Sequence, residues 1–422
     1  MQYIKTPTNG MNDFLPEEAK LREYVLRQIK DTYSDFGFML METPSVEHIE
    51  NLTSKQGGEN EKLIFKILKR GEKLLNADIP DDLDNADRLD RFVDSGLRYD
   101  LTVPLARYYA NNTAKLPAPF KALQIGNVWR ADRPQKGRFR QFTQCDIDIL
   151  GDWSILSEIE LVSSTGTILA KLGFKGAAIR INDRRILGAM AKKSGFSEGD
   201  FEKVFIILDK LDKIGIDGVK TELEKSGFAQ TSIEDYCRWF EKDVKDKIPS
   251  DFFVDKLDGY IDPSVIQNID KVLSSVNAVS SGEFSVVFDP TLVRGMAYYT
   301  GTIFEANIPG TNLSVGGGGR YDKMIGNFTG NEVPACGFSI GFERIIGLLT
   351  ESGFEVPEPK EKIAFLVDNG LETGQLLKMF EDVKKLRESG TNVMITSRSK
   401  NAKFQKETLR KFGYNQFKEF FR

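Results

Sequence analysis

The sequence predicts an α+β protein with two domains, a large domain of hairpin strands and helices and a small C-terminal α/β unit. Its 422 residues exceed what a single compact core usually supports. The pattern turns helical from about 195 to 275, within a region otherwise rich in strand signals, which indicates a helical insertion. Residues 351–362, rich in Pro, Glu and Lys, predict a linker. We therefore expect domains at 1–350 and 363–422.

Composition narrows the class of protein. Apolar residues make up 40% and charged residues 28% of the chain, an ordinary balance for a soluble globular protein. The first twenty residues contain no apolar signal-peptide core and no run of 18 apolar residues occurs, so we expect neither secretion nor a membrane partner. Cys145, Cys237 and Cys336 are far apart, which argues against a disulfide framework or zinc site and favours a reducing cytoplasm.

The chain has a single histidine, His48, and this count excludes several kinds of chemistry. Ser-His-Asp and Cys-His catalysis and histidine-rich metal centres all need histidine in the site. No Ser or Cys motif lies near His48, so we expect it to have a surface or packing role. Any reaction here must therefore use arginine, carboxylate, tyrosine and amide groups.

Local patterns predict the elements of the large domain in order. A helix begins at Pro16 and ends at the Asp35-Phe36-Gly37 turn. The run FMLMETPSVE is strand-like and should place Pro44 at an edge or a bend. Residues 67–95 predict loop and a short helix. One helix face in the insertion should hold Val204, Ile207, Leu208, Leu211 and Ile214. Other expected elements are a helix at 155–173, strands at 177–183, 284–290, 300–308 and 312–322, and a strand entering a helix at 334–350.

The strongest chemical signal is a predicted hairpin at 125–151. Its loop region carries five cations within eleven residues: Arg130, Arg133, Lys136, Arg138 and Arg140. Guanidinium forks suit phosphate oxygens. Alternation in the return strand predicts one face formed by Phe142, Gln144, Asp146 and Asp148. Gln144 and Asp148 are close enough there to bind one small polar ligand. These residues alone leave three interpretations of the hairpin open: a nucleotide or anion site, a nucleic-acid-binding ribbon, or a solvated edge.

Three further segments offer groups for a polar ligand. LVRGMAYYTG places Arg294 near two tyrosines, which could line a ligand or pack a core. SVGGGGRYD lacks the spacing of a P-loop or a dinucleotide fold. Its glycines indicate close approach of a ligand or a neighbouring backbone, or a plain turn. GFSIGFERI places Arg344 where a strand enters a helix, suited to a base, a phosphate or a surface salt bridge.

Beyond the linker, the order strand, helix, strand, basic helix predicts a small βαβα unit. Residues 391–422 carry eight Lys or Arg against Glu407 and Glu419, a net charge of +6, which leaves −10 on the rest of the chain. A basic segment on an acidic body indicates either a polyanionic partner or a solvated helix face.

These motifs occur together in one known family. Over roughly residues 9 to 346, the chain resembles histidyl-tRNA synthetase in GMNDFLP, ETPSVE, YDLTVPLAR, WRADRPQKGRFRQFTQCDIDILG, LVRGMAYYTGTIFE, GGGGRYD and PACGFSIGFERI. The resemblance implies a class II synthetase fold: an antiparallel-sheet catalytic domain, the helical insertion, and a shortened anticodon-binding-like α/β domain. It also implies a homodimer joined partly through the Pro44 region. Histidine and ATP would form histidyl-adenylate with Mg²⁺, and histidine would then pass to the 3′ end of tRNA(His).

The resemblance also implies residue roles. Arg130 corresponds to the arginine that binds the α-phosphate and the histidine carboxylate, and Arg294 to the family's catalytic arginine. Arg138 and Arg344 correspond to ATP contacts. Asp100 and Thr102, expected on one strand face, and Leu101 between them correspond to contacts around the substrate's amino group. The residues expected to line the histidine pocket are Gln144, Asp148, Tyr298, Tyr299 and Tyr321. No side chain is assigned to Mg²⁺.

The chain departs from the family pattern at two places. Met296-Ala297 stand where the family often has Leu-Asp, and only about 60 residues follow the linker. The main alternative is the related histidine-sensing regulatory subunit of ATP phosphoribosyltransferase, which usually carries a shortened or altered C-terminal region. Three arginines suited to a triphosphate, Arg130, Arg138 and Arg344, favour the enzyme. A nucleic-acid-binding module without chemistry would leave the amino-acid pocket unexplained.

Overall fold

The computed structural model describes residues 3–53, 61–77, 90–135, 137–240, 249–294, 299–311, 313–357 and 361–421. The chain divides into two compact units. The first comprises the residues up to Asp13 together with Val25–Ser352, and the second comprises Phe14–Tyr24 and the residues from Gly353 on. Helix α1 (Pro16–Asp35) begins at Pro16 and buries Val25, Ile29 and Tyr33, as its four-residue apolar spacing predicts.

The first unit is built on a mixed sheet of eight strands. Its central strands pair antiparallel, whereas the two edge strands, β1 and β8, pair parallel to their neighbours. In spatial order the strands are β1 (Met39–Met41), β5 (Phe120–Trp129), β6 (Gln141–Leu150), β11 (Ala335–Ile340), β10 (Ser314–Arg320), β9 (Thr302–Asn307), β7 (Ala177–Asp183) and β8 (Phe284–Phe288). The predicted hairpin is the β5–β6 pair.

Strand register brings distant polar residues into one row across the sheet. Asp146 on β6 lies opposite Ser339 on β11, which lies opposite Gly317 on β10, which in turn lies opposite Glu305 on β9. Because paired positions share a face, these four residues lie on the same side of the sheet. The opposite side of β6 carries apolar residues such as Ile147, which is completely buried. One face therefore forms the core, and the other is left for polar groups.

Helices cover the sheet and extend its polar face. The apolar face packs against α6 (Leu156–Lys171) and α12 (Pro263–Val279), and α14 (Phe342–Glu351) follows β11 directly. On the other side, α5 (Thr102–Asn112) packs against α13 (Asp322–Thr329) over a buried cluster that includes Tyr321. The start of α14 and the turn before α5 therefore lie close to the polar face.

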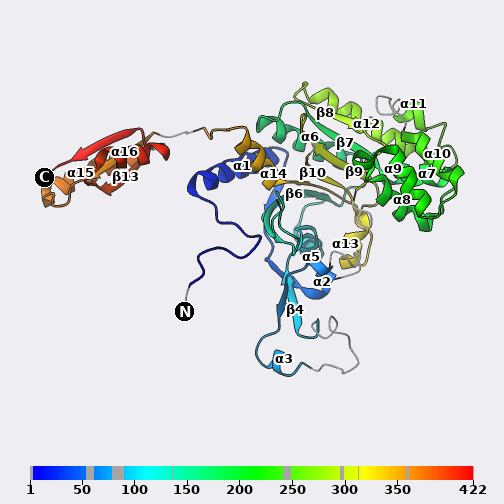
Figure 1. The fold of residues 1–422 in the computed structure, drawn as a ribbon, viewed down its shortest axis with the longest axis horizontal. Coiled ribbons are helices and arrows are strands. Elements are labelled where there is room, and N and C mark those ends of the chain that lie inside the picture. Colours follow the sequence, from blue (N-terminus) through cyan, green and yellow to red (C-terminus); the bar gives the residue numbers. More distant parts are fainter. Residues whose placement is uncertain are drawn as a thin grey trace. The chain divides into compact units, whose positions relative to one another are not determined.

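The region predicted as helical, about 195 to 275, consists in its described parts of helices joined by turns and loops. Figure 1 shows these helices, drawn in green, together with α7 (Arg184–Lys193), which precedes them. They are α8 (Phe201–Leu208), α9 (Leu211–Lys225), α10 (Gln230–Cys237), α11 (Pro249–Phe253) and most of α12. The single helix face predicted across residues 204–214 is wrong. The chain breaks between α8 and α9 and kinks again at Gly215 (φ 69°), which leaves Ile214 37% exposed.

A small second sheet lies in the stretch predicted as loop and short helix. The expected helix is α3 (Glu72–Leu75), and Pro44 lies in the connection between β1 and β2 (Val46–His48), next to a bend at Ser45. Strands β3 (Lys66–Leu68) and β4 (Val93–Leu97) were not predicted. They are too short to show alternation, and non-local pairing in the order β2-β4-β3 holds them. Helix α2 (Ile49–Thr53) follows β2, and β4 and α3 extend away from the main sheet (Figure 1).

The second unit contains the predicted βαβα pattern and one more strand. Its elements are β12 (Lys362–Val367), α15 (Thr373–Glu388), β13 (Asn392–Ser397), α16 (Ala402–Lys411) and β14 (Gln416–Phe420). The parallel sheet has the order β13-β12-β14, with a core around Phe365 and Met379. Strand β14 was not predicted because its charged sequence QFKEF pairs only with a distant strand. Within the described parts of the chain, no helix has the length and apolar character needed to cross a bilayer.

Candidate active site

A cavity of about 260 Å³ opens on the polar face of the sheet in the first unit. It is bounded by the β5–β6 hairpin, by β10 and β11, and by the first turn of α14. Five residues selected from the sequence line it: Arg130, Arg138, Gln144, Arg294 and Arg344. The fold therefore brings together groups from three separate sequence segments. His48, in contrast, lies exposed at the end of β2.

Arg130 is held in place at the end of β5 by aromatic rings and one carbonyl. Its guanidinium carbon lies 4.3 Å from the ring centroid of Tyr99 and 5.0 Å from that of Phe142. Its Nε donates a hydrogen bond to the carbonyl oxygen of Tyr99 at 3.2 Å. Cation–π contacts of this kind orient a guanidinium without neutralising its charge. Arg130 therefore remains available to an anion in the cavity.

Arg344 and Arg138 contribute further positive charge. Arg344 lies in the first turn of α14, and its Nη1 donates a hydrogen bond to the carbonyl oxygen of Ser314. Burial lowers the pKa of Arg344, and the nearby charges of Arg294 and Arg138 lower it further. This mutual repulsion shows that three guanidinium groups converge. Such an arrangement is stabilised by a polyanion such as a triphosphate.

Arg294 lies directly on the strands at the cavity floor. Its Nη1 donates to the carbonyl oxygens of Phe304 and Gly316, each at 3.2 Å, and its Nη2 lies 3.6 Å from Oε2 of Glu305. A Cβ atom at Gly317 would lie 1.2 Å from that Nη1. Only glycine at this position leaves room for the guanidinium. The glycine run predicted close approach of a ligand or a neighbouring backbone, whereas the group that approaches Gly317 is a side chain.

The next glycine in the run has a different neighbour. A Cβ atom at Gly318 would lie 2.0 Å from the carbonyl oxygen of Gly337 on β11. The backbones of β10 and β11 therefore pack too closely there for a side chain.

Buried polar groups lie beside the cavity, on β6 and β11. Gln144 and Ser339 line the cavity, whereas Asp146, Asp148 and Tyr321 are not among its lining residues. Asp146 and Asp148 are only 5% and 4% exposed. The Nε2 atom of Gln144 lies 3.3 Å from Oδ2 of Asp146 and 3.3 Å from Oγ of Ser339. The hydroxyl of Ser339 donates to Asp146, and the hydroxyl of Tyr321 donates to Asp148. Hydrogen bonds thus join both carboxyl groups to neighbouring strands.

Burial changes the protonation of these carboxyl groups. It raises the pKa of Asp146 to about 7. It also raises the pKa of Asp148 well above its usual range, and the negative charge of Asp146 adds to that rise. Sequence alternation placed Asp146 on this face, but only Gln144 and Asp148 were selected as site residues. Asp146 does not line the cavity but contacts Gln144, which does. It is therefore a supporting residue that sequence reasoning missed, although the alternation signal pointed to it.

The residues around Asp100 are arranged differently from the prediction, which put Asp100 and Thr102 on one strand face. Asp100 lies in the turn before α5, and Thr102 is the first residue of that helix. Oδ1 of Asp100 accepts hydrogen bonds from the backbone N–H groups of Thr102 and Val103, each at 3.1 Å. The carboxylate thereby satisfies free donors of the first helical turn, which is why a helix begins here. Leu101 is 1% exposed.

The tyrosines are only partly described. Tyr299 packs beside Gly319, where an added Cβ would lie 2.9 Å from its Cδ1 atom. Burial raises the pKa of Tyr299 to about 12. Tyr321 is 1% exposed, with its hydroxyl on Asp148. Tyr298 and the departure at Met296-Ala297 lie outside the described residues.

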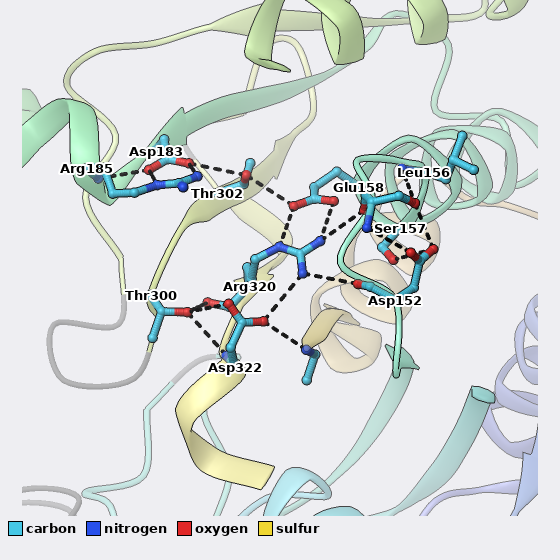
Figure 2. Close-up of polar contacts among 12 residues, drawn as sticks. Asp152, Leu156, Ser157, Glu158, Asp183, Arg185, Thr300, Thr302, Arg320 and Asp322 are labelled. Atoms are coloured by element: carbon cyan, nitrogen blue, oxygen red, sulfur yellow. Dashed lines mark hydrogen bonds and ion pairs between the residues drawn. The ribbon is translucent and has the colours of Figure 1, made fainter. Parts of the chain in front are cut away.

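An ion-pair network on the opposite side of β10 anchors this strand to α6 (Figure 2). Nε and Nη2 of Arg320 each lie 2.7 Å from a carboxylate oxygen of Glu158. Thr302 links Glu158 to Asp183, with its hydroxyl 3.3 Å from the first and 3.4 Å from the second carboxylate. Arg320 therefore points away from the cavity and holds the strand that supports its floor.

The described residues contain no group of three or more His, Cys, Asp or Glu side chains able to hold a metal ion. Asp132 and Glu343 nevertheless line the cavity. Mg²⁺ commonly binds through substrate phosphates together with one or two carboxylates. The donor set therefore fits a Mg²⁺ ion that arrives with a triphosphate.

Comparison with known proteins gives consistent results. The family described as Histidyl-tRNA synthetase matches residues 10–79 and 85–345. A histidine–tRNA ligase of Leifsonia xyli is 43% identical over 418 residues, covering 98% of this chain and 94% of that protein. One of Christiangramia forsetii is 39% identical over 400 residues, covering 90% and 84%.

Solved structures show the same relationship. The crystal structure of histidyl-tRNA synthetase from Nostoc sp. PCC 7120 has a TM-score of 0.79 at 28% identity, covering 98% of this chain and 90% of that one. A Bacillus halodurans structure described as an ATP phosphoribosyltransferase regulatory subunit/histidyl-tRNA synthetase has a TM-score of 0.77 over all of both chains. At 18% identity, that likeness shows the fold alone. The predicted α+β class II synthetase fold is confirmed, and the chain belongs to the histidyl-tRNA synthetase family.

Proposed function

We propose that this protein is a histidine–tRNA ligase whose cavity on the polar sheet face is the adenylation site. A carboxylate oxygen of histidine attacks the α-phosphorus of ATP, the bond to the β-phosphate breaks, and histidyl-adenylate and pyrophosphate form. A hydroxyl at the 3′ end of tRNA(His) then attacks the activated carbonyl and releases AMP. Four arginines and the amide of Gln144 converge on one cavity, with buried carboxyl groups beside it, and this convergence carries the proposal.

The reaction must bring two anions together, the carboxylate of histidine and the triphosphate of ATP. The positive charges of the arginines reduce the repulsion between them. In this proposal Arg130 binds the α-phosphate and the histidine carboxylate, and Arg138 and Arg344 bind the rest of the triphosphate. The substrate carboxylate is itself the nucleophile, so the enzyme needs no nucleophile of its own. Positioned cations lower the barrier by preorganised electrostatics and by alignment of the reactants.

Arg294 is proposed as the catalytic arginine that stabilises the charge developing at phosphorus. Backbone carbonyls and Glu305 hold its guanidinium before the substrates arrive. A group fixed in this way needs little reorganisation as the transition state forms. The rigid placement on β10 supports this role.

The histidine pocket is proposed beside this arginine, at Gln144, Asp148, Tyr299 and Tyr321. Tyr298, also expected there, lies outside the described residues. Buried hydrogen-bonding groups discriminate between ligands better than apolar shape does, because a wrong ligand leaves them unpaired. Asp100, Leu101 and Thr102 are proposed near the amino group of histidine. Since Oδ1 of Asp100 already accepts two backbone N–H groups, Oδ2 is the oxygen proposed for that contact.

The same proposal includes a bound Mg²⁺ ion, a homodimer and a cytoplasmic location of the protein. Asp132 and Glu343 would hold Mg²⁺ with the phosphates of ATP, and the ion would neutralise charge on the leaving pyrophosphate. The dimer is proposed to join partly through the Pro44 region, and the protein to act in the cytoplasm.

Histidine-dependent exchange of pyrophosphate into ATP tests the proposal. A ligase should catalyse this exchange without tRNA and should then charge tRNA(His). The regulatory-subunit alternative predicts histidine binding without exchange, whereas a nucleic-acid-binding module predicts neither. Histidine binding without exchange in the presence of Mg²⁺ and ATP would therefore contradict the proposal.

A further inference from the structure

The proposed adenylation reaction gives no role to Ser339, which lines the cavity, or to Asp146, which contacts Ser339. They lie opposite each other in the β6–β11 register, on the polar face of the sheet. Asp146 is 5% exposed, and a buried carboxyl group is costly unless it is hydrogen-bonded. Both residues contact the same third group, the side-chain amide of Gln144.

The donors and acceptors in this cluster determine how the Gln144 amide is turned. The hydroxyl of Ser339 has one hydrogen, which it donates to Oδ1 of Asp146. Its oxygen can therefore accept from Nε2 of Gln144, which lies 3.3 Å away. The same Nε2 lies 3.3 Å from Oδ2 of Asp146, and an ionised carboxylate can only accept. Both neighbours thus require the NH₂ end of the amide.

The other end of the amide consequently has no hydrogen-bond partner among the described residues. Its oxygen, Oε1 of Gln144, is buried. Gln144 also lines the cavity proposed for the substrates. A buried acceptor without a partner costs free energy, which a bound N–H donor would recover.

We propose that Asp146 is a positioning residue that, with Ser339, holds the Gln144 amide so that Oε1 accepts an N–H group of bound histidine. The inference rests on the proposed placement of histidine on this face. Asp146 itself does not contact the substrate. It selects which end of the amide the substrate meets, and therefore favours ligands that present a donor there.

The same geometry makes histidine binding depend on pH. Burial raises the pKa of Asp146 to about 7, so the group changes charge near neutrality. A protonated Asp146 can donate to Oε1, which lets the amide turn and present NH₂ to a substrate N–H. Binding should therefore weaken as the pH falls through about 7. The charged and titratable groups that interact with Asp146 from neighbouring elements are Tyr33, Arg98, Asp100, Arg130, Asp148 and Tyr299.

Calorimetric titration of the full-length protein with histidine tests this inference at pH 8.5 and pH 5.5. At pH 8.5, Asp146→Asn should weaken histidine binding by about 10- to 100-fold. The new side chain can donate as well as accept a hydrogen bond, so it no longer fixes which end of the Gln144 amide faces the ligand. At pH 5.5 the ratio of variant to parent Kd should fall towards one, since protonation gives the parent a similar neutral group. The titration of histidine itself cancels in this ratio. ATP affinity should stay unchanged.

A double-mutant cycle separates positioning from independent binding. If Asp146 acts through Gln144, adding Asp146→Asn to Gln144→Ala should cause no further loss. Asp217→Asn, the same chemical change on the exposed side of α9, is the control and should match the parent. Ser339→Ala keeps the carboxylate and removes one anchor, so it should give a smaller loss and provides the test if Asp146→Asn does not fold.

Three results would overturn the inference in distinguishable ways. A Kd ratio independent of pH, or additive losses in the cycle, would show that Asp146 does not act through Gln144. If Gln144→Ala weakens binding but Asp146→Asn at pH 8.5 does not, the inference alone fails. If Gln144→Ala leaves histidine binding unchanged, the proposed placement of histidine fails and the inference fails with it.

Discussion

At the residue scale, the guanidinium of Arg294 lies on the backbone of β10, bound by carbonyl oxygens of two neighbouring strands at 3.2 Å each. The strand can accept it only because Gly317 has no side chain. Asp146 differs, because its role depends on protonation, which burial brings close to neutral pH. The placement of Arg294 therefore depends on the space left by Gly317, whereas the charge state of Asp146 depends on desolvation.

Gly317→Ala should reduce adenylate formation nearly as much as Arg294→Ala. The new Cβ would lie 1.2 Å from Nη1, so the guanidinium must leave its site. Loss of a positioned transition-state cation costs about 10²–10³-fold in rate, and histidine affinity should fall much less. Single-turnover adenylation kinetics with histidine titrations measure both quantities. Gly347→Ala in α14, where a Cβ meets no atom within 4 Å, is the control. Wild-type rates for Gly317→Ala would contradict the placement of Arg294.

Asp146→Asn should stabilise the protein at neutral and higher pH, even if it weakens histidine binding. The folded-state pKa is about 7 against an ordinary value of 3.8, so the folded state binds the proton more tightly. Stability therefore falls as pH rises from about 4 to 7, by up to about 1.4 kcal/mol per pH unit. Asn does not titrate and avoids this loss.

Urea unfolding without ligand, at pH 5 and pH 8, measures the difference. The gain of Asp146→Asn over the parent should be larger at pH 8, whereas Asp217→Asn should show no such trend. A gain that is equal at both pH values would mean that the carboxyl of Asp146 titrates normally.

At the scale of elements, β10 is fixed from both sides. On the cavity side it supports Arg294, and on the other side Arg320 joins it to Glu158 of α6 through two contacts of 2.7 Å (Figure 2). The side chains of Arg320 and Glu158 are only 9% and 2% exposed. A break in a buried pair leaves an uncompensated charge, which is costly. The position of the cavity floor therefore depends on this distant contact.

Glu158→Gln should destabilise the protein by about 3 kcal/mol, because the buried guanidinium of Arg320 would lose its two-contact carboxylate and keep, among the described carboxylates, only Asp322, 3.4 Å from its Nη1. Glu160→Gln, on the same helix, breaks the pair between Lys121 and a 42% exposed Glu160 and should cost less than about 1 kcal/mol. Chemical denaturation of both variants gives the two free energies of unfolding. Equal losses in the free energy of unfolding would show that burial does not strengthen the contribution of the Arg320–Glu158 pair to stability.

At the scale of the whole molecule, the proposed active site lies entirely within the first unit, and the basic segment lies in the second. The structure shows which cations of that segment are free to contact tRNA and which already have a carboxylate partner. Lys406 and Arg398 both pair with Glu419 on β14, so two of the eight cations of this segment already have a carboxylate partner within the unit. Lys403 and Arg410 on α16 are exposed and have no ion pair with a described residue.

If α16 contacts tRNA phosphates, Lys403→Gln and Arg410→Gln should each lower the salt slope of tRNA binding by somewhat under one unit. Lys406→Gln should lower it less, because its charge already pairs with Glu419. Filter binding over a salt series gives the slopes, and histidine-dependent pyrophosphate exchange should be normal in all three. Equal slopes for every variant and the parent would leave α16 without an electrostatic role.

The sequence by itself determined the features that depend on residues close together in the chain, such as the position of a helix or the face of a strand. Apolar spacing placed α1, and alternation placed Gln144 and Asp148 on one face of β6, because helix and strand periods are local properties. It misplaced Asp100 and Thr102 in a strand and missed β14. A carboxylate that caps a helix, and a strand that pairs with a distant one, show little local signal.

Only the tertiary structure decided which separate segments meet. Strand register set Asp146 opposite Ser339 and Gly317 opposite Glu305, and it thereby created the space for Arg294. Burial, which no single segment determines, then moved the pKa of Asp146 towards neutrality. The residue types were readable from the chain. Their contacts and charge states follow from pairing and desolvation across positions far apart in sequence.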